Sequence, residues 1–158
     1  GMAKNVESNL LALGCDVDLV TNSNEIIKKR YVDNGSNQMV LRVDENDKCD
    51  RINHRKLKSF HGYDAIIISD YCKGFLDEDD IEYICNNYKN VFIDTKKKLG
   101  GWIISADFIK INGVEHQKNF EIIPNYPELN NKLIITRGKE GCIYKNKKVV
   151  QKHGVSTI

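Results

Sequence analysis

The stretch Tyr63-Asp64-Ala65-Ile66-Ile67-Ile68-Ser69-Asp70-Tyr71 decides the fold class. Its apolar centre is continuous, which is typical of a strand that is buried on both faces of a sheet. Three similar runs follow it, at 91–94, 107–111 and 133–136. A segment with helical spacing, Asp77–Tyr88, lies between the first two runs and places Ile81, Ile84, Cys85 and Tyr88 on one side. Because buried strands alternate with helices, the sequence predicts an α/β domain with a mostly parallel sheet flanked by helices.

An earlier pair of segments does not belong to this parallel pattern. The runs 26–32 and 38–44 alternate polar and apolar residues, and Asn34-Gly35 lies between them. An Asn-Gly pair between two alternating runs is typical of a β-hairpin. We therefore expect a small antiparallel hairpin apart from the main sheet. Its open edges and apolar face must pack on a ligand or on another subunit.

The remaining segments complete the expected order of elements. A helix is expected over Asn5–Leu13, ended by Gly14. We also expect a strand over 16–21, a polar surface helix over 48–60, and a final hairpin with strands at 141–144 and 149–152.

Composition excludes several classes of protein. The 158 residues are 41% hydrophobic and 29% charged, which excludes intrinsic disorder. Basic and acidic residues number 24 and 22, so no nucleic-acid surface is expected. No apolar run is longer than Ala65–Ile68, far short of the roughly 20 residues of a membrane span.

The cysteines point to a reducing compartment. There are five, widely spaced, without a C-x-x-C pair, and no secretory signal precedes them. We expect reduced thiols in a cytoplasmic protein. Because the four histidines are equally scattered, no metal site is expected from these residue types. The acidic run 77–80 could bind a metal, but an acidic first turn that complements the helix dipole is the favoured interpretation.

Polar residues stand at the carboxyl ends of the four predicted strands. In an open α/β sheet, ligands bind at this edge. Neither a phosphate-binding P-loop, a dinucleotide fingerprint nor a G-x-S-x-G elbow is present. The strand ends are Ser69-Asp70-Tyr71, Asp94-Thr95-Lys96, Lys110-Ile111-Asn112 and Thr136-Arg137-Gly138.

Five motifs in order resemble those of the ribokinase-like (PfkB) carbohydrate kinases, most closely the heptose 7-phosphate kinase domain of bifunctional heptose kinase/adenylyltransferases. They run over nearly the whole chain. They are Ala3-Lys4-Asn5-Val6 with Asn9-Leu10 and Ala12-Leu13-Gly14, the hairpin Arg30-Tyr31-Val32-Asp33 with 37–44, Ser69-Asp70-Tyr71-Cys72-Lys73-Gly74, Asn112-Gly113-Val114-Glu115, and Thr136-Arg137-Gly138-Lys139-Glu140-Gly141.

The resemblance implies a single ribokinase-like domain over residues 3–158, shortened at both ends, with residues 26–44 as a lid hairpin. Gly1-Met2 looks like a tag remnant ahead of a start methionine. The ligands implied are ATP, Mg²⁺ and a sugar phosphate, and a homodimer through the lid is expected.

Site residues follow from the same resemblance. The resemblance implies that the sugar is contacted by Asn5, Arg42, Asp70 and Lys73. It implies that the nucleotide, its phosphates and magnesium are contacted by Asn112, Glu115, Thr136 and Gly138. Each sugar contact has a structural alternative: Asn5 could cap a helix, Asp70 and Lys73 could form an ion pair, and Arg42 with Asp44 could lie on a solvated face.

No catalytic residue is assigned. The family places its base in a Gly-Ala-Gly-Asp motif at a helix N-terminus, and the sequence stops at Ile158, just before that motif is due. The family's first strand, and a Gly-x-Asp turn with further elements after Thr21, are also missing. We expect a kinase-like protein that has lost catalysis. The alternatives are an active kinase completed by a partner chain and a non-catalytic partner-binding domain.

Overall fold

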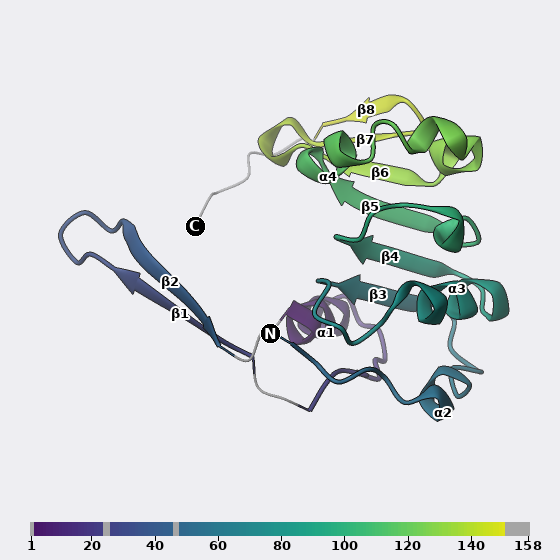
Figure 1. Ribbon diagram of the computed structural model, residues 1–158, viewed down its shortest axis with the longest axis horizontal. Helices are drawn as coiled ribbons and strands as arrows, with labels where there is room; N and C mark the ends of the chain where they lie inside the picture. The colour runs from purple at the N-terminus through teal and green to yellow at the C-terminus, as the bar shows by residue number, and fades with distance from the viewer. Residues whose placement is uncertain (1, 24–25, 46–47, 151–158) are drawn as a thin grey trace. The chain divides into compact units, whose positions relative to one another are not determined.

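A computed structural model describes residues 2–23, 26–45 and 48–150, and the chain divides into two compact units (Figure 1). The first unit contains Gly1–Ile52 with Lys73–Phe75, and the second contains Asn53–Cys72 with Leu76–Ile158. The fold is mixed α/β, with a six-stranded mixed sheet and a separate two-stranded antiparallel sheet. Both sheets were predicted from the alternation and length of the apolar runs.

The first unit begins with helix α1 (Met2–Ala12). Gly14 follows it with φ +81°, the left-handed conformation that the predicted glycine end of the helix requires. The predicted strand at 16–21 is wrong, because these residues form no ladder with another strand in the described part of the chain. Alternating polarity favours an extended segment, but it does not supply a partner strand.

The predicted hairpin is formed by β1 (Ile27–Val32) and β2 (Met39–Glu45), which pair antiparallel. Its turn differs from the expected Asn-Gly turn. The Asp33 carboxylate accepts hydrogen bonds from the Ser36 amide and hydroxyl, each at 2.7 Å, and Asn37 takes the left-handed conformation. These two bonds hold the pKa of Asp33 below its usual value. A longer Asx-type turn therefore replaces the tight one.

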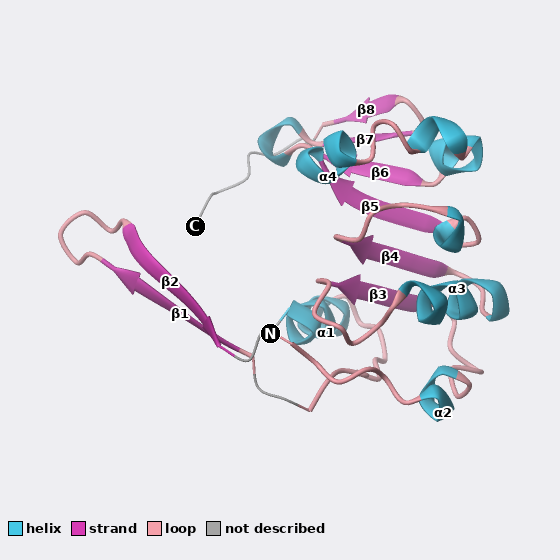
Figure 2. Cartoon of the chain, viewed as in Figure 1, coloured by secondary structure: helices cyan, strands magenta, loops and turns pink. Residues whose placement is uncertain are grey.

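The second unit is built on a sheet with strand order β3-β4-β5-β6-β7-β8 (Figure 2). The first four strands are parallel, as predicted, and the last two are antiparallel. The strands are β3 (Ile66–Asp70), β4 (Val91–Thr95), β5 (Phe108–Asn112), β6 (Leu133–Thr136), β7 (Cys142–Tyr144) and β8 (Lys147–Val149). The last strand thus begins before the predicted 149–152, of which 151–152 lie outside the described residues.

Short helices connect the strands. The long surface helix expected over 48–60 reduces to a single turn, since only the Asn53 side chain caps it and its apolar pattern is weak. The helices are α2 (His54–Leu57), α3 (Glu78–Asn87), η1 (Gly101–Ile103), α4 (Gly113–Lys118), η2 (Ile123–Asn125), η3 (Pro127–Asn131) and η4 (Gly138–Glu140). No helix in the described ranges is long and apolar enough to cross a membrane.

The core of the second unit lies on one face of the sheet. Alternate strand residues Ile68, Val91, Ile93, Ile109 and Ile111 are no more than 4% exposed. Helix α3 contributes its predicted apolar side to the buried set, and η1 contributes a tryptophan and an isoleucine. This packing fixes the strands in register and sets the positions of their carboxyl ends.

Candidate functional site

The candidate site is the carboxyl edge of the parallel strands β3 to β6. Strand register places Asp70 beside Thr95 and Asn112 beside Thr136, so the predicted polar strand ends are neighbours in pairs. Because parallel strands end at the same edge, these groups share one rim of the sheet.

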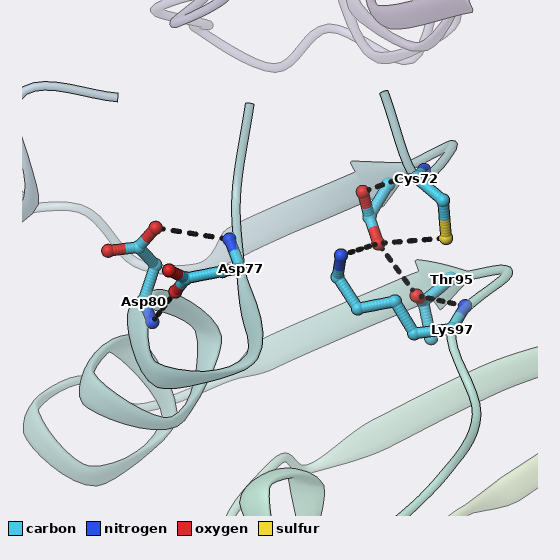
Figure 3. Close-up of polar contacts among 6 residues, drawn as sticks. Cys72, Asp77, Asp80, Thr95 and Lys97 are labelled. Atoms are coloured by element: carbon cyan, nitrogen blue, oxygen red, sulfur yellow. Dashed lines mark hydrogen bonds and ion pairs between the residues drawn. The ribbon is translucent and has the colours of Figure 1, made fainter. Parts of the chain in front are cut away.

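Asp70 is the most buried carboxylate of this edge at 5% exposed. Its Oδ2 accepts a hydrogen bond from the Thr95 hydroxyl at 2.9 Å and lies 3.5 Å from Lys97 Nζ. Its Oδ1 accepts from the Cys72 amide at 3.0 Å, and the Cys72 thiol also faces it, as Figure 3 shows around Thr95 and Lys97. Asp70 is therefore held by Thr95 of β4 and by the Cys72 amide in the loop after β3, and Lys97 balances its negative charge.

Cys72 is unsuited to act as a nucleophile here. Burial and the charge of Asp70 raise the pKa of its thiol. The thiolate is the reactive form, so a raised pKa suppresses reactivity at neutral pH.

A second polar group lies along the same rim. Lys110 Nζ pairs with Asp94 Oδ2 at 2.9 Å, and the two are register partners on β5 and β4.

Tyr71 follows β3 and contacts a cation: Lys96 Nζ lies 4.4 Å from the centre of the Tyr71 ring. Burial, and then the charge of Asp94, raise the pKa of the Tyr71 hydroxyl. The phenol therefore stays protonated and can donate a hydrogen bond to an anionic ligand.

Asn112 and Glu115 form a reciprocal cap on α4. Asn112 Oδ1 accepts from the Glu115 amide at 2.9 Å, and Glu115 Oε2 accepts from the Asn112 amide at 2.7 Å. Asn119 lies behind them, 3% exposed, and its side chain donates to the Glu115 carbonyl and accepts from the Leu99 amide. Glu115 Oε1 has no hydrogen bond within the described part of the chain. The Asn112–Glu115 pair thus has a structural role, and Oε1 of Glu115 remains available to contact a ligand.

The loop after β6 contains the predicted nucleotide-side residues. The Thr136 hydroxyl donates to the Ile111 carbonyl at 3.4 Å, and Gly138 has φ +55° with open space where a Cβ would be. Gly141 differs, because a Cβ there would overlap the Val149 carbonyl oxygen. Gly138 therefore leaves the backbone accessible to a ligand, whereas Gly141 is required by the hairpin.

The other three predicted sugar residues belong to the first unit. Asn5 is exposed inside α1, so the helix-cap alternative is wrong for this residue. The Arg42 guanidinium donates two hydrogen bonds of 2.7 Å to the Asp44 carboxylate. These bonds lower the pKa of Asp44, and the charges of Lys28 and Lys73 lower it further. Arg42 and Lys73 therefore lie near one carboxylate.

The acidic run at the start of α3 has a structural role. Asp77 accepts from the Asp80 amide at 2.9 Å and Asp80 accepts from the Asp77 amide at 3.1 Å, as drawn in Figure 3. Among the described residues, no group of three His, Cys, Asp or Glu side chains could hold a metal ion. The favoured helix-start interpretation fits this geometry.

Sequence reasoning missed Lys97 and Asn119. The three consecutive lysines at 96–98 were the available signal for Lys97, although the sequence does not tell which of them turns inward. Asn119 follows Glu115 by one helical turn, which is too common a spacing to single it out.

Comparison with known proteins adds no assignment: the chain matches no protein-family model and no curated protein sequence. The geometry and the motifs therefore carry the functional argument.

Proposed function

We propose that this chain is a ribokinase-like protein of sugar-kinase ancestry that binds a phosphorylated ligand at the carboxyl edge of β3 to β6. The observation that carries the proposal is the row of register-paired polar strand ends, Asp70 with Thr95 and Asn112 with Thr136. The ordered motifs along the chain point the same way. Lys96, whose ammonium group lies over the Tyr71 ring, adds positive charge beside these strand ends, which suits phosphate.

A nucleotide with magnesium is the ligand pair that the motifs imply. Magnesium prefers oxygen ligands and keeps several waters. Glu115 offers one carboxylate oxygen, since the other is held by the Asn112 amide. A single carboxylate oxygen can contact the water molecules of a hydrated magnesium ion, but it cannot replace those waters as a full set of protein ligands. Thr136 and Gly138 would then lie on the nucleotide side.

Binding without phosphoryl transfer is the expected behaviour of these 158 residues by themselves. Transfer to a sugar needs a base within hydrogen-bond reach of the attacking hydroxyl. The two aspartates of the strand ends are already engaged, Asp70 by Thr95 and Lys97, and Asp94 by Lys110. An active kinase completed by a partner chain is the main alternative.

We also propose that the hairpin forms a homodimer contact. Tyr31, Val40 and Leu41 are 54%, 73% and 54% exposed, and a lone two-stranded sheet is marginally stable in water. A two-fold contact would cover these side chains on both copies.

We propose a cytoplasmic location, because all five cysteines are free thiols, as expected in a reducing compartment.

Calorimetric titration tests the binding proposal. ATP with Mg²⁺, and separately a heptose 7-phosphate, should each bind the native chain. The Asn112→Ser variant should weaken ATP binding, because serine can replace the helix cap but not the amide group. Val114→Ser, on an exposed side chain of the same helix, is the matched control.

A parallel assay for ADP release tests the expected lack of turnover. The native chain should release ADP no faster than buffer with any sugar or sugar phosphate. Turnover that disappears in Asn112→Ala would contradict this part of the proposal and favour the active kinase. Absence of binding by either ligand would favour a partner-binding domain.

A further inference from the structure

Two residues to which the motifs give no role lie side by side at the candidate edge. Tyr71 directly follows β3, and Lys96 directly follows β4. The pairing of these strands continues as far as Lys96, whose amide donates to the Asp70 carbonyl at 3.3 Å. The Lys96 ammonium lies over the Tyr71 ring, 4.4 Å from its centre. The two side chains therefore form one unit, the Tyr71–Lys96 pair.

The turn after β3 fixes the position of Tyr71. The Asp70 carboxylate accepts a hydrogen bond from the Cys72 amide at 3.0 Å, and Cys72 takes the left-handed conformation with φ +56°. Asp70 is itself held by the Thr95 hydroxyl at 2.9 Å. Because Tyr71 lies between Asp70 and Cys72, its backbone is ordered before any ligand binds. Such ordering lowers the entropic cost of binding.

Lys96 differs from two nearby lysines, because no carboxylate pairs with it in the described ranges. Lys97 Nζ lies 3.5 Å from Asp70 Oδ2, and Lys110 Nζ lies 2.9 Å from Asp94 Oδ2. Lys96 is exposed and has only an aromatic contact among the described residues. A cation above a ring keeps ammonium hydrogens free to donate to an anion. Lys96 therefore brings an unbalanced positive charge to this part of the edge.

The Tyr71 hydroxyl adds a hydrogen-bond donor beside this cation. Burial, and then the charge of Asp94, raise the pKa of the hydroxyl, so the phenol is protonated at neutral pH. A phosphate group has several strongly accepting oxygens. It can therefore accept hydrogen bonds from the Lys96 ammonium and the Tyr71 hydroxyl at the same time.

The place of the pair in the sheet favours the phosphate of a sugar over those of a nucleotide. Asp70, which the resemblance assigns to the sugar, immediately precedes Tyr71. Thr136, which it assigns to the nucleotide side, ends β6. Strand β6 is two strands away from β4, which is roughly 10 Å at the usual spacing of neighbouring strands. The pair thus lies at the sugar end of the candidate edge.

We infer that the Tyr71–Lys96 pair binds a phosphate group and that, within the proposed function on which this assignment rests, the group is the phosphate of the sugar. Lys96 Nζ supplies the positive charge, and the Tyr71 hydroxyl supplies a directed hydrogen bond. The pair makes the edge select phosphorylated sugars over free sugars.

Calorimetric titration of the full chain tests the assignment, with a heptose 7-phosphate and with the same heptose lacking the phosphate. The native chain should bind the phosphorylated sugar roughly tenfold or more tightly than the free sugar. Lys96→Gln and Tyr71→Phe should each lose about tenfold in affinity for the phosphorylated sugar, because each removes one donor to a charged group. Their affinities for the free sugar and for ATP with Mg²⁺ should not change.

Two further variants separate charge at this position from a general effect of charge. Lys96→Arg keeps the positive charge and should retain most of the affinity for the sugar phosphate. Lys98→Gln removes an exposed lysine from the same loop and is the matched control, which should bind as the native chain does.

A second readout needs no sugar. Inorganic phosphate added to the ¹⁵N-labelled chain should move the backbone amide signals of Tyr71 and Lys96 more than sodium chloride does at the same ionic strength. The shifts should be smaller in Lys96→Gln. The signals of Thr136 and Gly138 should not follow the same curve.

Unchanged affinity for heptose 7-phosphate in both Lys96→Gln and Tyr71→Phe would overturn the inference and leave the proposed function in place. A loss confined to ATP binding would also overturn it, because the pair would then belong to the nucleotide. If the native chain binds neither ATP nor the sugar phosphate, the proposed function is wrong. The titration with inorganic phosphate then decides the anion site by itself, and unmoved signals of Tyr71 and Lys96 would overturn it.

Discussion

Asp70 and Thr95 end neighbouring strands and share a buried hydrogen bond, with the threonine hydroxyl 2.9 Å from Asp70 Oδ2 and the two residues 5% and 0% exposed. The bond joins β3 to β4 at the edge where a ligand is expected. Lys97 balances the charge at 3.5 Å. A group held in this way keeps a fixed orientation toward a ligand at the same rim.

Thr95→Val should destabilise the fold by about 1–3 kcal/mol, because it removes both the hydroxyl donor to the buried Asp70 carboxylate and the acceptor of the Lys97 amide. Asp70→Asn should cost roughly 1–3 kcal/mol, since it leaves Lys97 without its anion. Urea unfolding measures both changes. Asp64→Asn, on an exposed side chain, should stay within about 0.5 kcal/mol. Equal effects for Asp64→Asn and Asp70→Asn would contradict the assigned geometry.

Asn112 separates stability from binding. Asn112→Ala should destabilise by about 1 kcal/mol, because the cap of α4 is lost, while Asn112→Ser should recover most of this loss. If Asn112 also contacts the ligand, Asn112→Ser keeps the stability but not the affinity. Thermal unfolding and calorimetry on the same samples measure the two effects. Full affinity in the serine variant would leave Asn112 with only its capping role.

The two glycines of the loop after β6 should respond differently to alanine. Gly141→Ala should cost more than the roughly 1–2 kcal/mol of a left-handed non-glycine residue, because its Cβ would also overlap the Val149 carbonyl. Gly138→Ala should cost only the roughly 1–2 kcal/mol of the left-handed backbone conformation, because a Cβ there would meet no other atom. Gly113→Ala, with a negative φ and open space around it, is the control and should be close to neutral. Chemical unfolding of the three variants checks this order, and a larger loss at Gly138 than at Gly141 would reverse it.

Alkaline pH should destabilise the protein through Cys85. Burial raises the pKa of this thiol from its usual 9.0 to about 12. Between these values the unfolded chain loses the cysteine proton and the folded chain retains it, so the free energy of unfolding falls as pH rises above about 9. Unfolding measured from pH 8 to pH 11 should show a steeper fall for the native chain than for Cys85→Ala. Parallel curves would show that another group controls the alkaline limit.

The parallel sheet could be predicted because its four strands are rich in apolar residues and their ends are polar. The 16–21 segment shows the limit of such reasoning, since its alternation is real but no strand pairs with it in the described residues. The hairpin was predicted with the wrong turn, because the Asp33 carboxylate accepts two hydrogen bonds from Ser36 that the Asn-Gly pattern does not include.

The candidate site was predicted in part. The position of Asp70, Asn112 and Thr136 at one edge of the sheet could be predicted, because parallel strands end at the same edge. Lys97 was missed because the path of the loop after β4 decides which of three lysines meets Asp70.

Nuclear magnetic resonance of the ¹⁵N-labelled chain tests the proposed ligand edge most directly. Titration with ATP and Mg²⁺ should move the backbone amide signals of Asn112, Thr136 and Gly138 along one saturable curve. The same titration of Asn112→Ser should require a higher concentration of nucleotide. A spectrum that does not change, or changes confined to residues away from the ends of β5 and β6, would contradict the proposal that this edge binds a phosphorylated ligand.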